Sequence, residues 1–252
     1  MKLALFSFIL LLTGLAAVAQ RIAPDTVGLP GSPLVIQPIN HASMVLTAAG
    51  GTIYIDPVGG AAKYQGLAAP DIILVTDIHG DHFDPATLQA IRKPATVLVA
   101  PKAVVDKMAD ADKAGVVVLG NGDSKDFSGI GVAAIPMYNL PASPTDPRHP
   151  KGRGNGYVLT VGGKKIYISG DTQGIPEMRA LTGIDIAFVC MNLPYTMDVN
   201  EAADAVLAFK PRIVYPYHYR GQGGFSDVSV FKAKVEAGNK GIEVRLRNWY
   251  AG

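Results

Sequence analysis

The sequence is poor in cysteine, in net charge and in histidine. Its one cysteine, Cys190, excludes an internal disulfide, and the apolar run around it indicates a buried thiol. The formal net charge is +2, which is too small to indicate a nucleic-acid or acidic partner, so we expect no nucleic acid to bind. Because 48% of the residues are hydrophobic and 17% are charged, the chain has ample material for a globular core.

Signatures of several common enzyme sites are missing as well. The chain has no serine nucleophile elbow, no phosphate-binding Gly-Lys loop and no dinucleotide-binding glycine fingerprint. No such motif therefore competes with a site built on histidine and carboxylate side chains. The chain has only five histidines, which are His41, His79, His82, His149 and His218.

The apolar run at the N-terminus is short. Residues 3–15 are mainly apolar and follow Lys2, whereas a membrane span needs roughly 20 residues. The small residues Ala17, Val18 and Ala19 are typical of a signal-peptide cleavage site, although an uncleaved anchor is the alternative. We therefore expect a signal peptide over residues 1–19, a mature protein that is periplasmic or secreted, and no stable membrane anchor after cleavage. Residues 20–33 are expected as a flexible lead-in to one domain over residues 34–252.

Residues 71–84 read DIILVTDIHGDHFD and contain the densest group of potential metal ligands. The apolar run 72–75 is typical of a strand buried on both faces, and Asp84-Pro85 is typical of a helix start. A polar turn that caps this helix is the alternative, but it does not explain two histidines interleaved with carboxylates. The pattern therefore predicts a metal site, and its candidate ligands are Asp77, His79, Asp81 and His82.

Strands and helices alternate from residue 34 onward without a break in composition. We expect strands at residues 34–39, 43–48, 52–56, 72–76, 96–100, 116–119, 131–136, 157–161, 165–169, 185–190, 212–217 and 243–247. Helices are expected at residues 85–92, 102–109, 176–181, 199–209 and 228–237. Each half has a hairpin followed by βα units, which suits two mixed sheets packed face to face with helices outside.

The stretch from Asp77 to His82 resembles the metallo-β-lactamase superfamily signature His-x-His-x-Asp-His, except that Asp77 stands in place of the first histidine. The resemblance covers roughly residues 34–247 and implies an α/β fold, the four-layer αββα sandwich, with two divalent metal ions. It implies that Asp171, in a Gly-Asp-Thr turn after a strand, bridges the two ions. It also implies that His218, at the end of a later strand, is the last metal-ligand histidine.

The sequence departs from the superfamily pattern at a second place. The pattern has a further ligand histidine at the end of a strand such as residues 131–136, but here that strand runs into Met137, Tyr138 and Asn139. Asn139 would supply a weak oxygen ligand, or His149 in the loop 140–156 would reach the metal instead. A solvent-exposed loop histidine is an equal alternative for His149.

Two residues near the N-terminus resemble site residues of the superfamily. The stretch from Asn40 to Ser43 is similar to a hairpin in the branch that includes L-ascorbate-6-phosphate lactonase and the N-acyl phosphatidylethanolamine phospholipase D proteins. By that resemblance His41 faces the site as a metal or substrate contact, whereas a turn histidine bonded to backbone is the alternative. Asp56 is expected to hydrogen-bond a ligand histidine, or else to belong to an ordinary Asp-Pro turn.

The resemblance implies a metal-dependent hydrolase that acts on a small molecule. Two ions about 3.5–4 Å apart lower the pKa of a bound water from 15.7 towards about 7, which provides a metal-bound hydroxide at neutral pH. Asp81, the expected catalytic residue, would orient it towards an ester, lactone or phosphodiester bond. We expect zinc, and manganese and iron are the alternatives, because the charge of Asp77 favours these harder ions somewhat more than a three-histidine site does. A metal-binding protein without turnover and a di-iron redox protein are the alternatives.

The loop 140–156 is the last candidate region. A loop of this length in a compact domain is often functional. Its cationic side chains would bind an anionic group of the substrate, or else they lie on a solvated surface: Arg148, Lys151 and Arg153.

Overall fold

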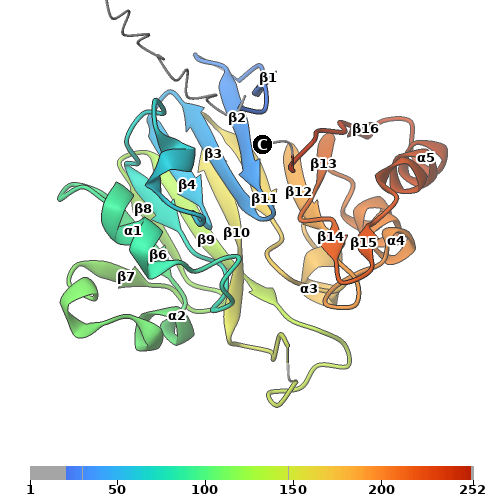
Figure 1. Cartoon of the computed structure of the whole chain (residues 1–252). Coiled ribbons are helices and arrows are strands. Elements are labelled where there is room, and N and C mark those ends of the chain that lie inside the picture. The colour runs from blue at the N-terminus through green and yellow to red at the C-terminus, as the bar shows by residue number, and fades with distance from the viewer. Residues whose placement is uncertain (1–20, 30, 147, 251–252) are drawn as a thin grey trace, which may run out of the picture.

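Two seven-stranded sheets packed face to face form the body of the computed structural model, which describes residues 21–29, 31–146 and 148–250 (Figure 1). The first sheet has the strand order β1-β2-β3-β4-β5-β6-β7. Its strands are β1 (Asp25–Val27), β2 (Leu34–Asn40), β3 (Ser43–Ala48), β4 (Gly51–Ile55), β5 (Ile72–Leu74), β6 (Val97–Ala100) and β7 (Val116–Val118).

The second sheet has the strand order β16-β13-β12-β11-β10-β9-β8. Its strands are β8 (Ser124–Phe127), β9 (Ile130–Met137), β10 (Gly154–Val161), β11 (Lys164–Ile168), β12 (Ile186–Cys190), β13 (Ile213–Tyr217) and β16 (Glu243–Val244). A separate short hairpin consists of β14 (Arg220–Gly221) and β15 (Gly224–Phe225).

Helices cover the outer sides of both sheets (Figure 1). Beside the first sheet lie α1 (Pro85–Ile91) and α2 (Lys102–Lys107), and beside the second lie α3 (Pro176–Arg179), α4 (Val199–Phe209) and α5 (Val228–Gly238). Two 3-10 turns, η1 (Ala61–Tyr64) and η2 (Asp110–Asp112), complete the set in the described ranges. The expected αββα sandwich is confirmed.

The alternation of side chains along each strand divides the apolar residues between two cores. On β3, Met44 and Leu46 face the main core between the sheets, whereas Val45 faces a smaller core that includes residues of α1 and α2. The main core also receives the apolar face of α4, including Val206 and Phe209. Each fully buried aliphatic side chain contributes about 1.5–3 kcal/mol relative to exposure, so these two layers stabilise the framework on which the site is built.

Parallel strands in both sheets end at the edge where the polar motifs lie. In the first sheet β4 to β7 are parallel, and in the second β11, β12, β13 and β16 are parallel. The carboxyl ends of such strands are the usual position of functional residues in open α/β sheets.

Several boundaries differ from the sequence prediction. Residues 25–27 of the expected lead-in form β1, because they pair with β2 through backbone hydrogen bonds that a composition argument does not reveal. The loop expected over residues 140–156 ends earlier, since β10 begins at Gly154 and pairs with β9. Strand β8 and the β14–β15 hairpin were not predicted.

The N-terminal segment is outside this description. The expected signal peptide, residues 1–19, falls on residues that the structure does not describe. Within the described residues, no helix combines the length and apolarity needed to cross a membrane.

Candidate metal centre

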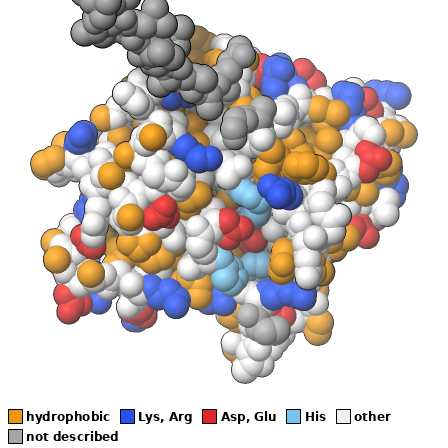
Figure 2. All heavy atoms as spheres, viewed as in Figure 1, with side chains coloured by type: hydrophobic (Ala, Val, Ile, Leu, Met, Phe, Trp, Pro, Cys, Tyr) orange, Lys and Arg blue, Asp and Glu red, His pale blue; other side chains and the backbone are white. Residues whose placement is uncertain are grey.

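Histidine and aspartate side chains from both sheets gather near the middle of one face of the molecule (Figure 2). Asp77, His79 and His82 come from the turn between β5 and α1, at the carboxyl end of β5 in the first sheet. Asp171 follows β11, and His218 directly follows β13, both in the second sheet. The centre therefore lies where the two sheets meet.

Three buried side chains, His82, Asp171 and His218, form a group that we call the inner cluster. The distance from Asp171 to the partner Nε2 atom is 3.5 Å for His82, measured from Oδ2, and 3.3 Å for His218, measured from Oδ1. Two ligands of one tetrahedral ion with bonds of about 2.0–2.1 Å lie about 3.3–3.4 Å apart. The spacing of the inner cluster is therefore that of ligands around one ion.

Three buried polar atoms of the inner cluster lack hydrogen-bond partners among the described residues, and they are His82 Nε2, Asp171 Oδ1 and His218 Nδ1. The first two belong to side chains that approach each other to 3.5 Å. Buried polar groups are almost always satisfied, because an unpaired group costs free energy on burial. A cation bound between His82 and Asp171 would satisfy the first two atoms, so the donor set fits a metal.

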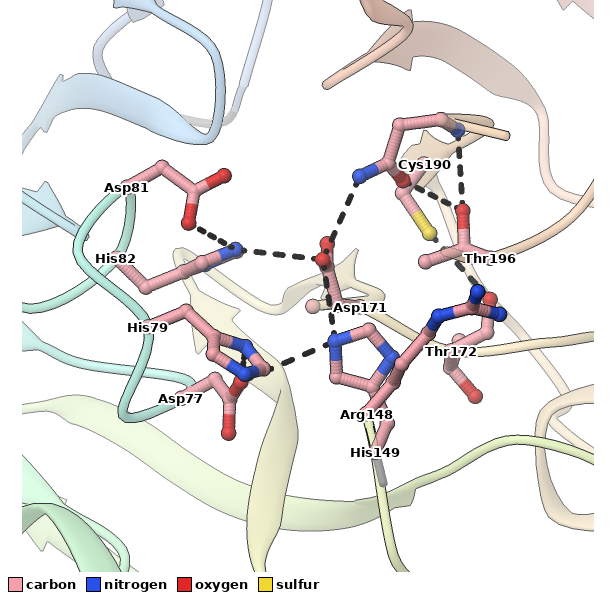
Figure 3. A network of polar contacts seen from close by, with 12 residues as sticks. Asp77, His79, Asp81, His82, Arg148, His149, Asp171, Thr172, Cys190 and Thr196 are labelled. Carbon is pink, nitrogen blue, oxygen red and sulfur yellow. Dashed lines mark hydrogen bonds and ion pairs between the residues drawn. The ribbon is translucent and has the colours of Figure 1, made fainter. Parts of the chain in front are cut away.

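The outer cluster consists of Asp77, His79 and His149. His79 Nδ1 lies 2.5 Å from Asp77 Oδ2, and His149 Nε2 lies 3.9 Å from the same oxygen. His149 Nε2 also lies 3.4 Å from Asp171 Oδ2 (Figure 3). Asp171 thus contacts histidines of both clusters, as a bridging carboxylate would.

His149 is buried in the site, and Asn139 contacts it. The side chain of His149 is only 2% exposed, which rules out the solvent-exposed alternative. The Oδ1 atom of Asn139 lies 3.3 Å from His149 Nδ1, and the backbone N–H of Asn139 donates to the backbone carbonyl of His149 at 2.9 Å. Asn139 therefore orients His149, and the geometry favours His149 as the ligand that replaces the missing histidine.

A buried carboxylate fixes the ring of His82. Asp56 Oδ2 lies 2.8 Å from His82 Nδ1, and Asp56 also accepts hydrogen bonds from the amide and hydroxyl of Thr76 at 2.7 and 2.6 Å. This arrangement presents His82 Nε2 to the centre of the site. Burial alone would lower the pKa of His82, but the carboxylates of Asp171 and Asp56 raise it well above its ordinary value. Metal binding would therefore displace a proton from His82.

A glycine turn places Asp171 at the centre. Gly170 has a φ of +60°, and a Cβ added there would lie 2.4 Å from Met137 Sδ, so the position requires glycine. The Gly170 amide donates to the hydroxyl of Tyr217 at 3.0 Å. Burial would raise the pKa of Asp171, but the charges of His218 and His82 hold it well below its ordinary range.

Asp81 and His41 lie at the rim of the site beside His218. Asp81 is 43% exposed, and its Oδ2 lies 3.3 Å from His218 Nε2. Burial opposes its ionisation, but the hydrogen bond with His218 and the charge of His82 keep its pKa below the ordinary value. His41 packs edge-on against His218 and Tyr250, and burial and the charge of His218 lower its pKa to about 4. At neutral pH Asp81 is therefore ionised and His41 is neutral.

Sequence reasoning missed Asn192. Its Nδ2 atom lies 3.5 Å from Asp171 Oδ2 and 3.4 Å from His218 Nε2, and its Oδ1 accepts a hydrogen bond from the hydroxyl of Thr196 at 2.5 Å. The available signal was its position just after the buried strand that ends at Cys190, on the same edge as Asp171 and His218.

Two of the three loop cations contact protein carboxylates. Lys151 pairs with Glu177 at 2.9 Å, and Arg153 donates to both oxygens of Asp77 at 3.2 Å. The expectation that Lys151 and Arg153 bind a substrate anion therefore needs correction, because their charges are already paired with the carboxylates of Glu177 and Asp77.

Arg148, the third loop cation, has a different environment. Its side chain is exposed, donates to the carbonyl of Pro194 at 2.8 Å and lies over the ring of Tyr195. Neither contact is with a carboxylate, and Arg148 forms no ion pair within 4 Å among the described residues, although its backbone amide donates to Asp146 at 2.8 Å.

Comparisons with known proteins show the family of the chain. Residues 35–218 match the family model described as "Beta-lactamase superfamily domain". A UPF0173 metal-dependent hydrolase from Symbiobacterium thermophilum is 31% identical over 227 residues, which cover 84% of this chain and 96% of that protein. A crystal structure described as that of a metal-dependent hydrolase from Parabacteroides distasonis has 40% identity and a TM-score of 0.79, covering 90% of this chain and 98% of the other.

A metallo hydrolase from the archaeon Ignicoccus hospitalis is similar in fold, with a TM-score of 0.71 and 23% identity over 85% of this chain and 95% of that one. The family match extends from β2 to the last inner-cluster histidine, so it includes both clusters. The chain therefore belongs to the metallo-β-lactamase superfamily, among relatives that are named metal-dependent hydrolases.

Proposed function

We propose that this protein uses two divalent metal ions to hydrolyse an ester, lactone or phosphodiester bond in a small molecule. The observation that supports this proposal most strongly is the position of Asp171. Its two oxygens contact His82 and His218 of the inner cluster and His149 of the outer cluster. A shared carboxylate of this kind is typical of two-metal hydrolytic sites.

When bound, the two ions would supply an activated water and would stabilise negative charge that develops on the substrate. The chain's own contribution begins with Asp81. Since its pKa is below the ordinary value, its exposed carboxylate accepts a hydrogen bond from a water at neutral pH and orients that water.

His41 is proposed as a substrate contact. Its ring lies beside His218, and as a neutral imidazole it offers one donor and one acceptor without adding charge to a cationic site. We further propose that Arg148 binds an anionic group of the substrate, because its exposed guanidinium lies in the same loop as His149.

Zinc is the proposed metal, because imidazole nitrogen and carboxylate oxygen are its usual ligands in hydrolases. Manganese and iron are the alternatives, since Asp77 adds a hard oxygen donor where the superfamily pattern has a nitrogen donor. Elemental analysis of the purified protein decides between them.

The test is a screen of esters, lactones and phosphodiesters with metal-loaded protein, followed by the Asp81→Asn variant on any substrate found. We expect Asp81→Asn, which keeps an oxygen donor beside His218, to lower kcat by about 10²-fold or more, since positioned acid–base groups contribute 10²–10⁴-fold. The matched control is Asp84→Asn, which changes the N-cap of α1 and should leave kcat almost unchanged. Absence of turnover on every substrate class with two metals bound would favour a metal-binding protein without activity.

A further inference from the structure

Asp77 of the outer cluster forms a bidentate ion pair with Arg153. Arg153 Nε donates to Asp77 Oδ1 and Arg153 Nη2 donates to Asp77 Oδ2, each at 3.2 Å. The Asp77 side chain is fully buried and that of Arg153 is 17% exposed. Paired hydrogen bonds fix the plane of a carboxylate as well as its charge, and Arg is the side chain that supplies them.

The same guanidinium also contacts the loop that contains His149. Arg153 Nη2 donates a hydrogen bond to the carbonyl oxygen of Arg148, the residue before His149. Since Asp77 belongs to the turn after β5, Arg153 connects two parts of the chain that each provide one member of the outer cluster. One side chain therefore contacts Asp77 directly and the backbone next to His149.

The charge of Asp77 explains why such a side chain is needed. The superfamily signature has a neutral imidazole at this position, whereas here His149 Nε2 lies near two carboxylates, 3.9 Å from Asp77 Oδ2 and 3.4 Å from Asp171 Oδ2. Burial disfavours an ionised carboxylate, and a paired guanidinium compensates because it keeps its charge at all accessible pH values. Aspartate and arginine together therefore have the net charge of the histidine that they replace.

We propose that Arg153 is a positioning residue of the outer cluster, which neutralises Asp77 and holds it and the His149 loop in place for metal binding. Asp77 and Arg153 then act as one unit in place of the first histidine of the superfamily pattern. This proposal rests on the two-metal assignment above, and it does not depend on which bond is cleaved.

The test compares metal content among variants of the full chain, measured by elemental analysis after dialysis against zinc. Asp77→His alone restores the signature but leaves the guanidinium of Arg153 unpaired beside a cation. We expect this variant to keep the inner metal and lose the outer one. The double variant Asp77→His with Arg153→Met removes the unpaired charge and should regain most of the outer metal.

A matched control uses the other cation of the loop. Lys151 pairs with Glu177 and does not contact Asp77, so Asp77→His with Lys151→Met should behave like Asp77→His alone. Retention of the inner metal shows that each variant is folded. The proposal is overturned if Asp77→His alone binds both metals as the natural protein does, or if the Arg153→Met change restores no metal to it.

A conservative variant covers the case in which Asp77→His does not fold. Arg153→Lys keeps the positive charge but cannot form the paired hydrogen bonds with Asp77. We expect the outer metal to transfer to a chelator about 10- to 100-fold more readily than in the natural protein, with transfer of the inner metal unchanged. Unchanged transfer of the outer metal would also overturn the proposal.

Discussion

The inner and outer clusters are alike in ligand chemistry but are built by different parts of the fold. The inner cluster takes Asp171 and His218 from the ends of two parallel strands, and all of its side chains are buried. The outer cluster takes His149 from the loop between β9 and β10, and its His79 side chain is 41% exposed.

This difference shows how each cluster obtains its geometry. Strand ends fix the inner cluster through the sheet itself, with Asp56 holding the ring of His82. The outer cluster depends on local ties, which are Asn139 to His149 and Arg153 to Asp77. We therefore expect the outer cluster to be the more labile of the two, and the following variants test that expectation.

The largest effect is expected for Asp171→Ala, because the Asp171 carboxylate lies within 3.5 Å of histidines of both clusters. Bound metal should fall from about two equivalents to fewer than one. His218→Ala should lose only the inner metal. Elemental analysis measures the metal content of both variants. The control is Asp185→Ala, which removes the ion-pair partner of Lys164. Two equivalents retained by Asp171→Ala would show that the bridging assignment is wrong.

Asp56→Asn should weaken the inner cluster selectively. The carboxylate that fixes His82 Nδ1 is lost, and such supporting groups typically contribute 10- to 100-fold to metal affinity. Zinc competition with a fluorescent chelator measures the change for each metal. An equal loss from both clusters would indicate general unfolding instead of a specific effect on His82.

In the natural protein, a chelator should remove the outer metal before the inner one. Because His79 is exposed and His149 lies in a loop, we expect exchange of the outer metal to be faster by about tenfold, equivalent to about 1.4 kcal/mol in barrier height. Stopped-flow chelation with a metal indicator resolves the two phases. Assignment of the fast phase uses His149→Ala, which should abolish it; if the inner metal leaves first, the comparison of the clusters is wrong.

Asn139→Ala should have a smaller effect in the same direction. Its contact with His149 is 3.3 Å long and is supported by the backbone bond between the same residues, so the ring loses only one of its restraints. We expect outer-metal affinity to fall by less than about tenfold. A measurable change in inner-metal affinity would contradict the separation of the two clusters.

The smallest effect concerns a carboxylate far from either cluster. Asp25 on β1 accepts hydrogen bonds from Tyr215 and Arg245 at 2.8 and 3.2 Å and pairs with Arg247 at 2.5 Å. Burial would raise its pKa, but the hydrogen bonds from Arg247 and Tyr215 lower it from 3.8 to about 2. This stabilisation is therefore present above pH 3.8 and is lost as the pH falls through 2.

Denaturant unfolding of metal-free protein tests this prediction. Asp25→Asn should lower the free energy of unfolding by about 1 kcal/mol at pH 7, a value that allows for solvent screening. The difference from the natural protein should vanish near pH 2. A difference that persists there would mean that Asp25 acts through packing and not through its charge.

The sequence predicted the inner cluster better than the outer one for a physical reason. Asp171 and His218 each follow an apolar strand pattern, and parallel strands bring their carboxyl ends to one edge. The position of His149 depends on the path of a long loop, which the local pattern does not determine, so two alternatives stayed open until the structure was known. The contact of Arg153 with Asp77 joins residues far apart in sequence, and charge alone suggested a substrate contact instead.

The same limit applies to the edges of the fold. Strand β1 has only three residues, and its place in the sheet is set by pairing with β2 and not by its own periodicity. The central strands were predicted because continuous apolar runs such as residues 186–190 are buried on both sides.

Both clusters draw their candidate ligands from both sheets, so their formation is coupled to folding. His79 and His82 follow β5 of the first sheet, whereas His149, Asp171 and His218 belong to the second-sheet half of the chain. Neither cluster is complete until the two sheets have docked, so a metal held by either cluster would bind only after docking. Metal present at about 1,000 times its dissociation constant would favour the docked state by about 4 kcal/mol. The ions would thus act as removable cross-links between two halves that the chain joins by a single connection, between β7 and β8.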